Sequence, residues 1–263
     1  MATDTNTTES MAAAAPAPGT LLEVSHLSTD FVMNKGTVHA VVDMSFTVRE
    51  GEVLAIVGES GSGKSVASLS IMGLLQHPGR VVSGDITYRG RNLLALSPRQ
   101  MREVRGNHIS MIFQEPMTSL NPVFTVADQL TESIREHMKI DKKAALARAI
   151  EMLRLVGIPS AEKRIHDYPH QMSGGMRQRV MTAMAISCNP HLLIADEPTT
   201  ALAVTHQAQI LAPPGGLRKT VGMAGRLMTQ DTGVAADTAN AEGGCDGGQG
   251  GGRLGEGGGI QHD

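Results

Sequence analysis

The chain has 263 residues, a formal net charge of −3 and a sequence pI near 6.4. This length is enough for one large α/β domain with an inserted subdomain, and the balanced charge excludes a nucleic-acid partner held by bulk electrostatics. Two distant cysteines, Cys188 and Cys245, argue against a disulfide framework or a zinc site and favour a reducing compartment. No apolar run approaches the roughly 20 residues of a membrane-spanning helix, and the acidic start is unlike a signal peptide.

The first elements predict two kinds of strand in one core. Residues 1–20 are rich in Thr, Ala and Pro without periodicity, which predicts a disordered leader. Alternating apolar and polar residues over 21–32 and 38–48 are typical of half-buried antiparallel strands. The continuous apolar run at 52–58 is instead typical of a strand that is buried on both faces.

A helical insertion is predicted in the middle of the chain. Helical spacing over 65–77 gives way to strand patterns over 81–94 and 108–114. Apolar residues then recur four apart over 125–138, and a second helix follows with Asp141 as N-cap and Gly157 as its end. The buried-strand pattern resumes with "HLLIADE", which places the insertion at about residues 115–188.

Past Thr205 the pattern weakens. Pro213 and Pro214 interrupt a helical run, and each interior proline costs about 3 kcal/mol or more. Gly225 and Arg226 fall in the middle of a candidate strand that would be doubly buried. We therefore expect a main domain over 21–239 whose C-terminal part is incomplete, followed by a glycine-rich disordered tail over 240–263.

One segment matches a phosphate-binding motif. "GESGSGKS" follows the buried strand and precedes a helix, as G-x-x-x-x-G-K-[ST] requires, although a glycine-rich turn before an ordinary helix is the alternative. Its backbone N–H groups and the helix N-terminus favour a phosphate, Lys64 would contact the β- and γ-oxygens, and Ser65 would bind Mg²⁺. The predicted ATP contacts in this loop are Gly58, Glu59, Ser60, Gly61, Ser62, Gly63, Lys64 and Ser65.

Two acids follow the later apolar strand, "LLIADE". Alone they usually mark the solvated end of a strand. Together with the phosphate loop, and at the end of a neighbouring parallel strand, Asp196 is expected to hold Mg²⁺ through its water shell. Glu197 is then expected to orient or deprotonate the attacking water.

The motifs together resemble the ATP-binding subunit of ABC transporters. After the phosphate loop come Gln114 at the position of the family's Q-loop, then "MSGGM" at 172–176, which is similar to the LSGGQ signature, and then the two acids. Residues 21 to about 211 are more narrowly similar to the bacterial subfamily that energises dipeptide, oligopeptide, nickel and glutathione importers.

This resemblance implies an α/β fold: a RecA-like P-loop NTPase core with an antiparallel β subdomain and an inserted helical subdomain. It implies ATP and Mg²⁺ as cofactors and a peripheral location on the cytoplasmic face of the bacterial inner membrane. The implied partners are permease subunits, a second ATP-binding subunit and, indirectly, a solute-binding protein, with no nucleic acid.

The resemblance also implies roles for particular residues. Ser173, Gly174 and Gly175 would meet the γ-phosphate held by the other subunit. Gln114 would touch Mg²⁺ and the attacking water, so that the catalytic residues are Glu197, Gln114 and Lys64. The segment "EPMTSLNP" after Gln114 would be the moving joint against the permease. Phe31 lies where the family stacks an aromatic ring on adenine, with core packing as the alternative.

Two positions depart from the family pattern. Ala203 stands where the D-loop has an acid, and Gln230 stands where the switch histidine belongs, whereas His206 is interpreted as a surface residue. An ATPase that drives peptide import is the leading hypothesis. The alternative is a degenerate nucleotide-binding module with little or no hydrolysis. A soluble ABC protein acting on DNA or ribosomes is disfavoured because the chain has no basic excess.

Overall fold

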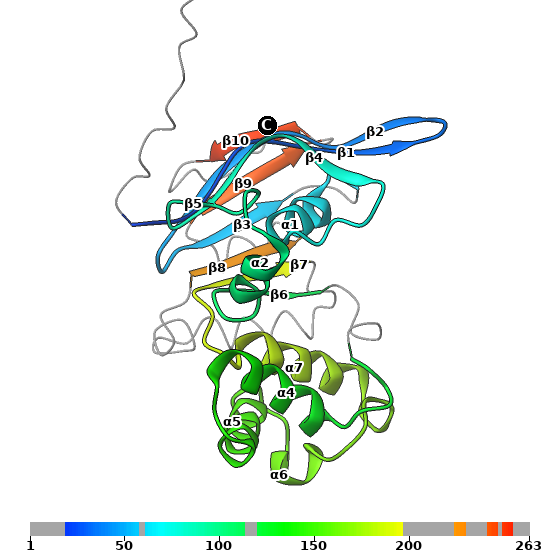
Figure 1. Ribbon diagram of the computed structural model, residues 1–263, viewed down its shortest axis with the longest axis vertical. Coiled ribbons are helices and arrows are strands. Elements are labelled where there is room, and N and C mark those ends of the chain that lie inside the picture. The colour runs from blue at the N-terminus through cyan, green and yellow to red at the C-terminus, as the bar shows by residue number, and fades with distance from the viewer. Residues whose placement is uncertain are drawn as a thin grey trace, which may run out of the picture.

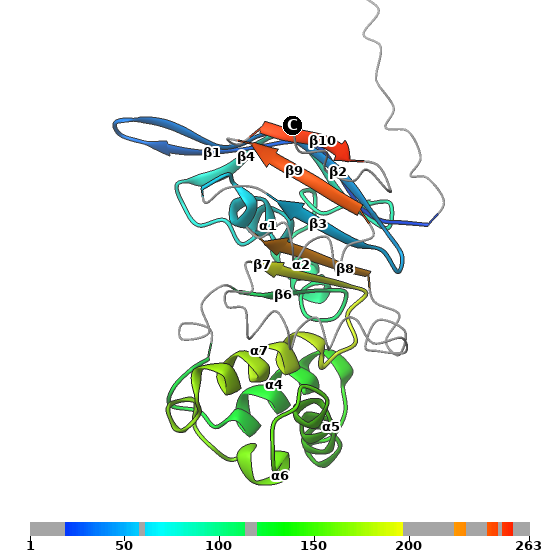
Figure 2. The same ribbon diagram turned by 180° about the vertical axis from the view of Figure 1, so that it is seen from behind.

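The computed structural model describes residues 19–57, 61–113, 120–196, 224–229, 241–246 and 249–254. Within these ranges the strands form one sheet in the order β5-β4-β1-β2-β10-β9-β3-β8-β7-β6. Figures 1 and 2 show this sheet from opposite sides, with the helices α4 to α7 gathered beyond its β6 edge. Residues 1–18 of the expected disordered leader lie outside the described residues.

One half of the sheet is antiparallel. It consists of β1 (Thr20–Met33), β2 (Gly36–Arg49), β4 (Gly79–Tyr88) and the short β5 (Arg91–Asn92), with β1 in the middle. The hairpin that joins β1 to β2 projects past the rest of the sheet (Figure 1). The alternation of polar and apolar residues in the sequence correctly predicted these antiparallel strands.

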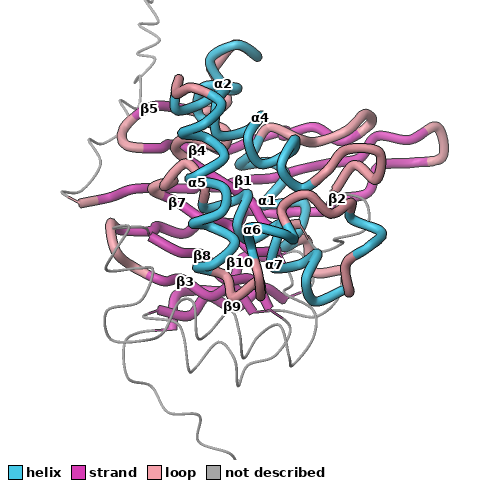
Figure 3. The backbone as a smooth tube through the Cα atoms, turned by 90° about the horizontal axis from the view of Figure 1, so that it is seen from below, coloured by secondary structure: helices cyan, strands magenta, loops and turns pink. Residues whose placement is uncertain are grey.

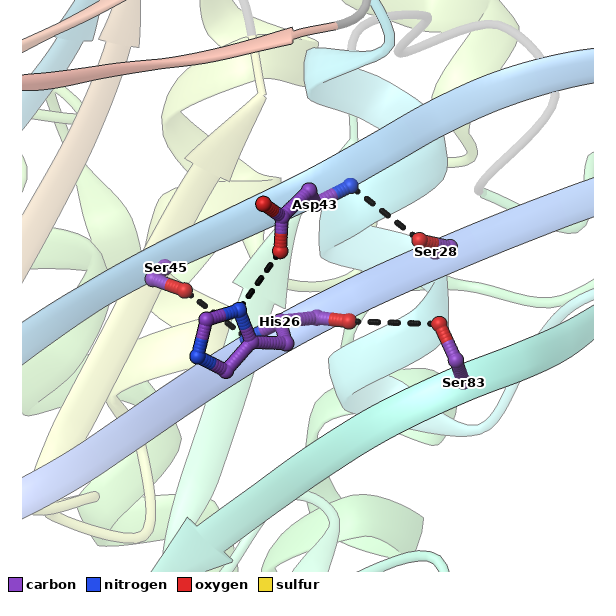
Figure 4. A network of polar contacts seen from close by, with 5 residues as sticks. All are labelled: His26, Ser28, Asp43, Ser45 and Ser83. Carbon is purple, nitrogen blue, oxygen red and sulfur yellow. Dashed lines mark hydrogen bonds and ion pairs between the residues drawn. The ribbon is translucent and has the colours of Figure 1, made fainter.

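The antiparallel strands are irregular at several points, one of which Figure 4 shows from close by. His26 on β1 and Asp43 on β2 both have left-handed backbones, with φ of 51° and 52°, where the strand register shifts. Ser45 Oγ accepts a hydrogen bond from His26 N, and Ser28 Oγ accepts one from Asp43 N. Ser83 Oγ donates to the carbonyl of His26. Hydroxyls from three strands therefore satisfy backbone groups that these β-bulges release from the ladder.

The other half of the sheet is parallel. The strands β3 (Val53–Val57), β8 (Ala224–Thr229), β7 (Leu192–Asp196) and β6 (Ile109–Ile112) lie side by side, each parallel to its neighbour. The described side chains of β6 and β7 are buried, as the continuous apolar runs predict.

The helix α1 (Lys64–Met72) lies between the two halves of the sheet. Its buried Ala67 and Ile71 join one apolar cluster with residues of β1, β2, β4, β6 and β7. The short helix α2 (Pro98–Val104) completes this cluster through Met101 and Val104. The helix α1 therefore packs against strands of both halves of the sheet.

A second cluster forms the helical subdomain. It is built from α4 (Val126–Met138), α5 (Lys142–Leu155), α6 (Ala161–Arg164), the 3₁₀ turn η1 (Pro169–Gln171) and α7 (Gly174–Ile186). Seen from below, these helices cover the sheet at one end (Figure 3). The predicted cap is confirmed, since Asp141 Oδ1 accepts a hydrogen bond from Ala144 N at 2.7 Å, and Gly157 follows α5 with φ of 77°.

The C-terminal strands differ from the sequence expectation. Gly225 and Arg226 lie within β8, which pairs with β3 on one side and β7 on the other. The strands β9 (Ala241–Asp246) and β10 (Gln249–Leu254) come from the segment that we expected to be a disordered tail. Glycine supplies the same backbone donors and acceptors as any residue, and pairing on both sides satisfies them. Pro213 and Pro214 lie outside the described residues.

Candidate phosphate and nucleotide site

The loop after β3 is shaped by glycine. Gly58, Glu59 and Ser60 lie outside the described residues, and the described part of the loop starts at Gly61. Gly61 and Gly63 have left-handed backbones, with φ of 82° and 86°. A Cβ on Gly63 would lie 2.2 Å from the carbonyl oxygen of Ala40 on β2, a contact that no real side chain makes.

Lys64 begins α1 and lies inside this loop. The residue is only 3% exposed, and its Nζ donates a hydrogen bond to Ser62 Oγ at 3.0 Å. The helix starts without a side-chain cap at Gly63, so the first N–H groups of α1 are directed toward the loop together with the ammonium group. Ser65, half-buried in the first turn, adds a hydroxyl next to Lys64. This donor set fits a phosphate group.

The strand β7 ends with Asp196, at the same edge of the sheet as the end of β3. It pairs with Met228 of β8, while Val57 at the end of β3 pairs with Thr229. The sequence analysis placed Asp196 on a strand next to β3, and this detail is wrong, because β8 lies between them. Two strand spacings separate the backbones by roughly 10 Å. The phosphate loop and Asp196 therefore lie on either side of the end of β8, at the carboxyl edge of the sheet. Glu197 lies just outside the described residues.

Gln114 also lies outside the described residues, two positions after the end of β6. Ile112 of β6 pairs with Ala195 of β7. The strand that leads to Gln114 thus ends beside the strand that carries Asp196. Ala203, His206 and Gln230 lie outside the described residues as well.

The signature segment starts another helix. Ser173 is the N-cap of α7, and its Oγ accepts a hydrogen bond from Met176 N at 3.3 Å. Ser173, Gly174 and Gly175 are all exposed, and a Cβ on Gly175 would meet nothing within 4 Å. Figures 1 and 2 place α7 beyond the β6 edge and α1 on the other side of it. One chain does not bring its signature segment to its own phosphate loop.

Phe31 lies on the projecting part of β1 and is half-buried. A Cβ on Gly79 of β4 would lie 2.7 Å from Cε1 of Phe31, so the ring packs directly on the backbone of Gly79. This contact supports a packing role, and contact with adenine remains a prediction.

The sequence analysis missed the residues that connect this hairpin to α1. Thr29 is fully buried on β1, and its Oγ1 lies 3.0 Å from Ser70 Oγ of α1. The available signal was the alternation of Leu27, Thr29 and Phe31, which puts a hydroxyl on the inward face of a strand.

Neither a cluster of metal-binding side chains nor a membrane-spanning helix is found in the part of the chain that the structure describes. Within the described ranges, no three or more His, Cys, Asp or Glu side chains gather as a metal site. Among the helices in the same ranges, none is long and apolar enough to cross a membrane.

A glycine-shaped loop that opens a helix at the carboxyl edge of a parallel sheet is the hallmark of P-loop nucleotide-binding proteins. A family model described as "ABC transporter" matches residues 41–200, more than half of the chain. The chain belongs to the ABC transporter family.

Curated relatives are similar over most of the chain. The probable peptide ABC transporter ATP-binding protein y4tR of Sinorhizobium fredii is 53% identical, covering 85% of this chain and 67% of its own. The oligopeptide transport ATP-binding protein OppD of Bacillus subtilis is 52% identical, covering 84% and 62% respectively. The dipeptide transport ATP-binding protein DppD of Haemophilus influenzae is 52% identical, covering 83% and 66%. The chain spans about two thirds of the length of these relatives.

Solved structures show the same fold. The dimeric bacterial ABC transporter cassette MJ0796 superimposes with a TM-score of 0.76 at 24% identity, over 87% of this chain and 96% of that cassette. The P-loop NTPase fold expected from the sequence is therefore confirmed, with both of its added subdomains.

Proposed function

We propose that this chain is the ATP-binding and ATP-hydrolysing subunit of an ABC transporter that imports peptides. The observation that carries the proposal is the phosphate loop, in which the buried Lys64 ammonium and the first turn of α1 follow Gly63, where a Cβ would lie 2.2 Å from the carbonyl oxygen of Ala40. The names of the relatives support peptides as the imported solute.

Different residues contact the phosphates, the metal ion and the attacking water during hydrolysis. The loop glycines and Lys64 would hold the β- and γ-phosphates, while Ser65, Gln114 and Asp196 would hold Mg²⁺, which would neutralise charge on the phosphates. Glu197 orients the attacking water and accepts its proton. Bound Mg-ATP supplies an activated γ-phosphoryl group and a stable leaving group, so that positioning and charge stabilisation account for most of the catalysis.

A second ATP-binding subunit completes the site. The helix N-terminus at Ser173, Gly174 and Gly175 is exposed and carries partial positive charge, which suits the γ-phosphate on the loop of a partner subunit. The separation of α7 from α1 in the fold supports contact between subunits rather than within one.

Permease subunits are the proposed membrane partner, on the cytoplasmic face of the bacterial inner membrane. Phe113, Val123 and Phe124 are exposed apolar side chains on either side of the segment that we expect to contact the permease. Phe113 also lines a pocket of about 290 Å³, together with Met181 and Met184 of α7 among others. A solute-binding protein would act on the far side of the membrane and not touch this chain.

The proposal is tested first by nucleotide binding. Lys64→Ala removes the ammonium from the loop and should weaken binding of Mg-ATP at least about 10-fold, measured by isothermal titration. The matched control is Lys143→Ala, which removes an exposed lysine on α5 and should bind as the wild type does. Equal affinity in both variants would refute the phosphate site.

Turnover separates an ATPase from a module that only binds nucleotide. Glu197→Gln keeps the shape of the side chain but removes the base, and it should lower the ATP turnover of the transporter complex by about 100-fold or more. Equal rates in wild type and variant would leave only nucleotide binding. If the wild type itself is slow, restoring Ala203→Asp and Gln230→His should raise its rate.

A further inference from the structure

A β-bulge on β2 supports the phosphate loop. Thr29 of β1 pairs with Val41, but the next residue, Asp30, pairs with His39, so Ala40 is an extra residue in the ladder. The carbonyl of Ala40 occupies the space where Gly63 would otherwise carry a side chain. The loop therefore rests on the backbone of the hairpin that also carries Phe31.

A buried pair of hydroxyls joins the same hairpin to α1. Ser70 Oγ donates its single hydrogen to the carbonyl of Val66 at 2.7 Å. Thr29 Oγ1, 3.0 Å away, must then be the donor to Ser70 Oγ. Thr29 is 0% and Ser70 is 2% exposed, so water does not compete for this bond.

Phe31 is tied to this pair through the strand itself. No extra residue interrupts β1 between Thr29 and Phe31, and side chains two apart on a strand share a face about 6.6 Å from each other. The Phe31 ring is also supported from behind by Gly79. The position of the ring relative to the loop is thus set by the Thr29–Ser70 bond and by the contact of Ala40 with Gly63.

We propose that Thr29, Ser70 and the Ala40 bulge are positioning elements that fix the distance from Phe31 to the phosphate loop, so that one nucleotide can place its base on Phe31 and its phosphates in the loop. This inference rests on the proposed function. It assigns to the hairpin a part in base affinity that is separate from phosphate binding.

The test compares two ligands, Mg-ATP and magnesium tripolyphosphate, which share the phosphates but not the base. Thr29→Val keeps the shape of the side chain and leaves no donor unpaired, because the Ser70 hydrogen stays on Val66. This variant should bind Mg-ATP about 5-fold more weakly and tripolyphosphate within about 2-fold of the wild type. Thr29→Ser, which keeps the hydroxyl, should restore the affinity for Mg-ATP.

The control removes an equivalent hydroxyl elsewhere. Thr131 is buried on α4 and donates to the carbonyl of Ala127 at 2.7 Å, so Thr131→Val imposes a similar loss far from the loop. It should leave both affinities unchanged. In a Phe31→Leu background, Thr29→Val should have no further effect on Mg-ATP, since the ring that it positions is gone.

Three results would overturn the inference: equal losses for both ligands in Thr29→Val, no loss for either, or equal binding of both ligands by the wild type. None of these contradicts the proposed function, which fails only if Lys64→Ala leaves Mg-ATP binding intact or Glu197→Gln leaves turnover intact. If Thr29→Val unfolds, Ser70→Ala breaks the same bond from the helix side and is measured instead.

Discussion

The helices α1 and α7 both have glycine at their N-termini, and the surroundings of these two N-termini are opposite. The start of α1 is enclosed, with Lys64 buried and Gly63 pressed against Ala40. The start of α7 is open, with Ser173 as a side-chain cap and room for a Cβ at Gly175. The first encloses the donors of the phosphate site that we propose, whereas the second presents the same kind of helix terminus on the surface of the chain.

The C-terminal ends of α1 and α7 are alike, so the contrast between the two helices is confined to their N-termini. Arg105 donates to the carbonyls of Met72 and Gly73 at the end of α1. Arg148 donates to the carbonyl of Ser187 at the end of α7. Both ends are therefore closed by an arginine from another element, as suits the negative end of a helix dipole. The structural difference between the two helices therefore lies at their N-termini.

A glycine-to-alanine substitution at each of the two helix starts should give the largest difference in stability between them. Gly63→Ala forces a side chain into a left-handed backbone and onto the Ala40 carbonyl, and it should destabilise the protein by about 2 kcal/mol or more. Gly175→Ala has space and should stay within about 0.5 kcal/mol of the wild type. Urea unfolding measures both, and similar losses in the two variants would show that the loops are equally constrained.

A smaller effect is expected from the cap of α7. Ser173→Ala removes the acceptor for Met176 N and should cost about 1 kcal/mol of stability in urea unfolding. Nucleotide affinity of the isolated subunit should not change, because Ser173 is remote from its own loop. Ser160→Ala is the control, since Ser160 precedes α6 without a capping hydrogen bond. A loss of Mg-ATP affinity in the isolated Ser173→Ala subunit would contradict the separation of the two helix starts.

The smallest effect is expected at the two histidines that directly precede β6 and β7. His108 and His191 stack there with ring centroids 5.5 Å apart and Nδ1 atoms at 3.4 Å, near Tyr88 and Arg89. Burial, followed by the charge of Arg89, lowers the pKa of both rings from the ordinary 6.5, while Glu50 raises that of His191 slightly.

Because the folded state binds these protons less readily than the unfolded chain, stability should fall as the pH drops below about 6.5. The loss at pH 5.5 relative to pH 7.5 attributable to this pair should be below about 1 kcal/mol, since both rings are only partly buried. His191→Asn should reduce the pH dependence of the urea midpoint, and the exposed His166→Asn should not. An unchanged pH dependence in His191→Asn would show that the stacked pair contributes nothing.

Several local elements were predictable because their signals lie close together in the sequence. The phosphate loop, the Asp141 cap and the end of α5 at Gly157 each depend on residues within one short stretch of sequence. Local chemistry of this kind is readable from residue types and spacing alone. In the structure the signature segment is an exposed helix start with Ser173 as its N-cap, and its contact with a partner's γ-phosphate stays a prediction.

The errors concern pairing between distant segments. The place of β8 between β3 and β7 depends on backbone hydrogen bonds that glycine makes as well as valine, so Gly225 and Arg226 were misleading. The bulge at Ala40 was equally invisible, because it arises from the register between two strands and not from a residue type. Sequence patterns report which face is buried, and they report register poorly.

The position of β8 has a consequence for how the chain is made. The strand that joins β3 to β7 is synthesised about 170 residues after β3, so each of its two neighbours leaves the ribosome with an unpaired edge. Closing so long a loop is slow, and open edges of apolar strands pair readily with other chains. Aggregation during synthesis should therefore depend on how quickly the last third of the polypeptide emerges, and slowing translation there should lower the yield of folded protein.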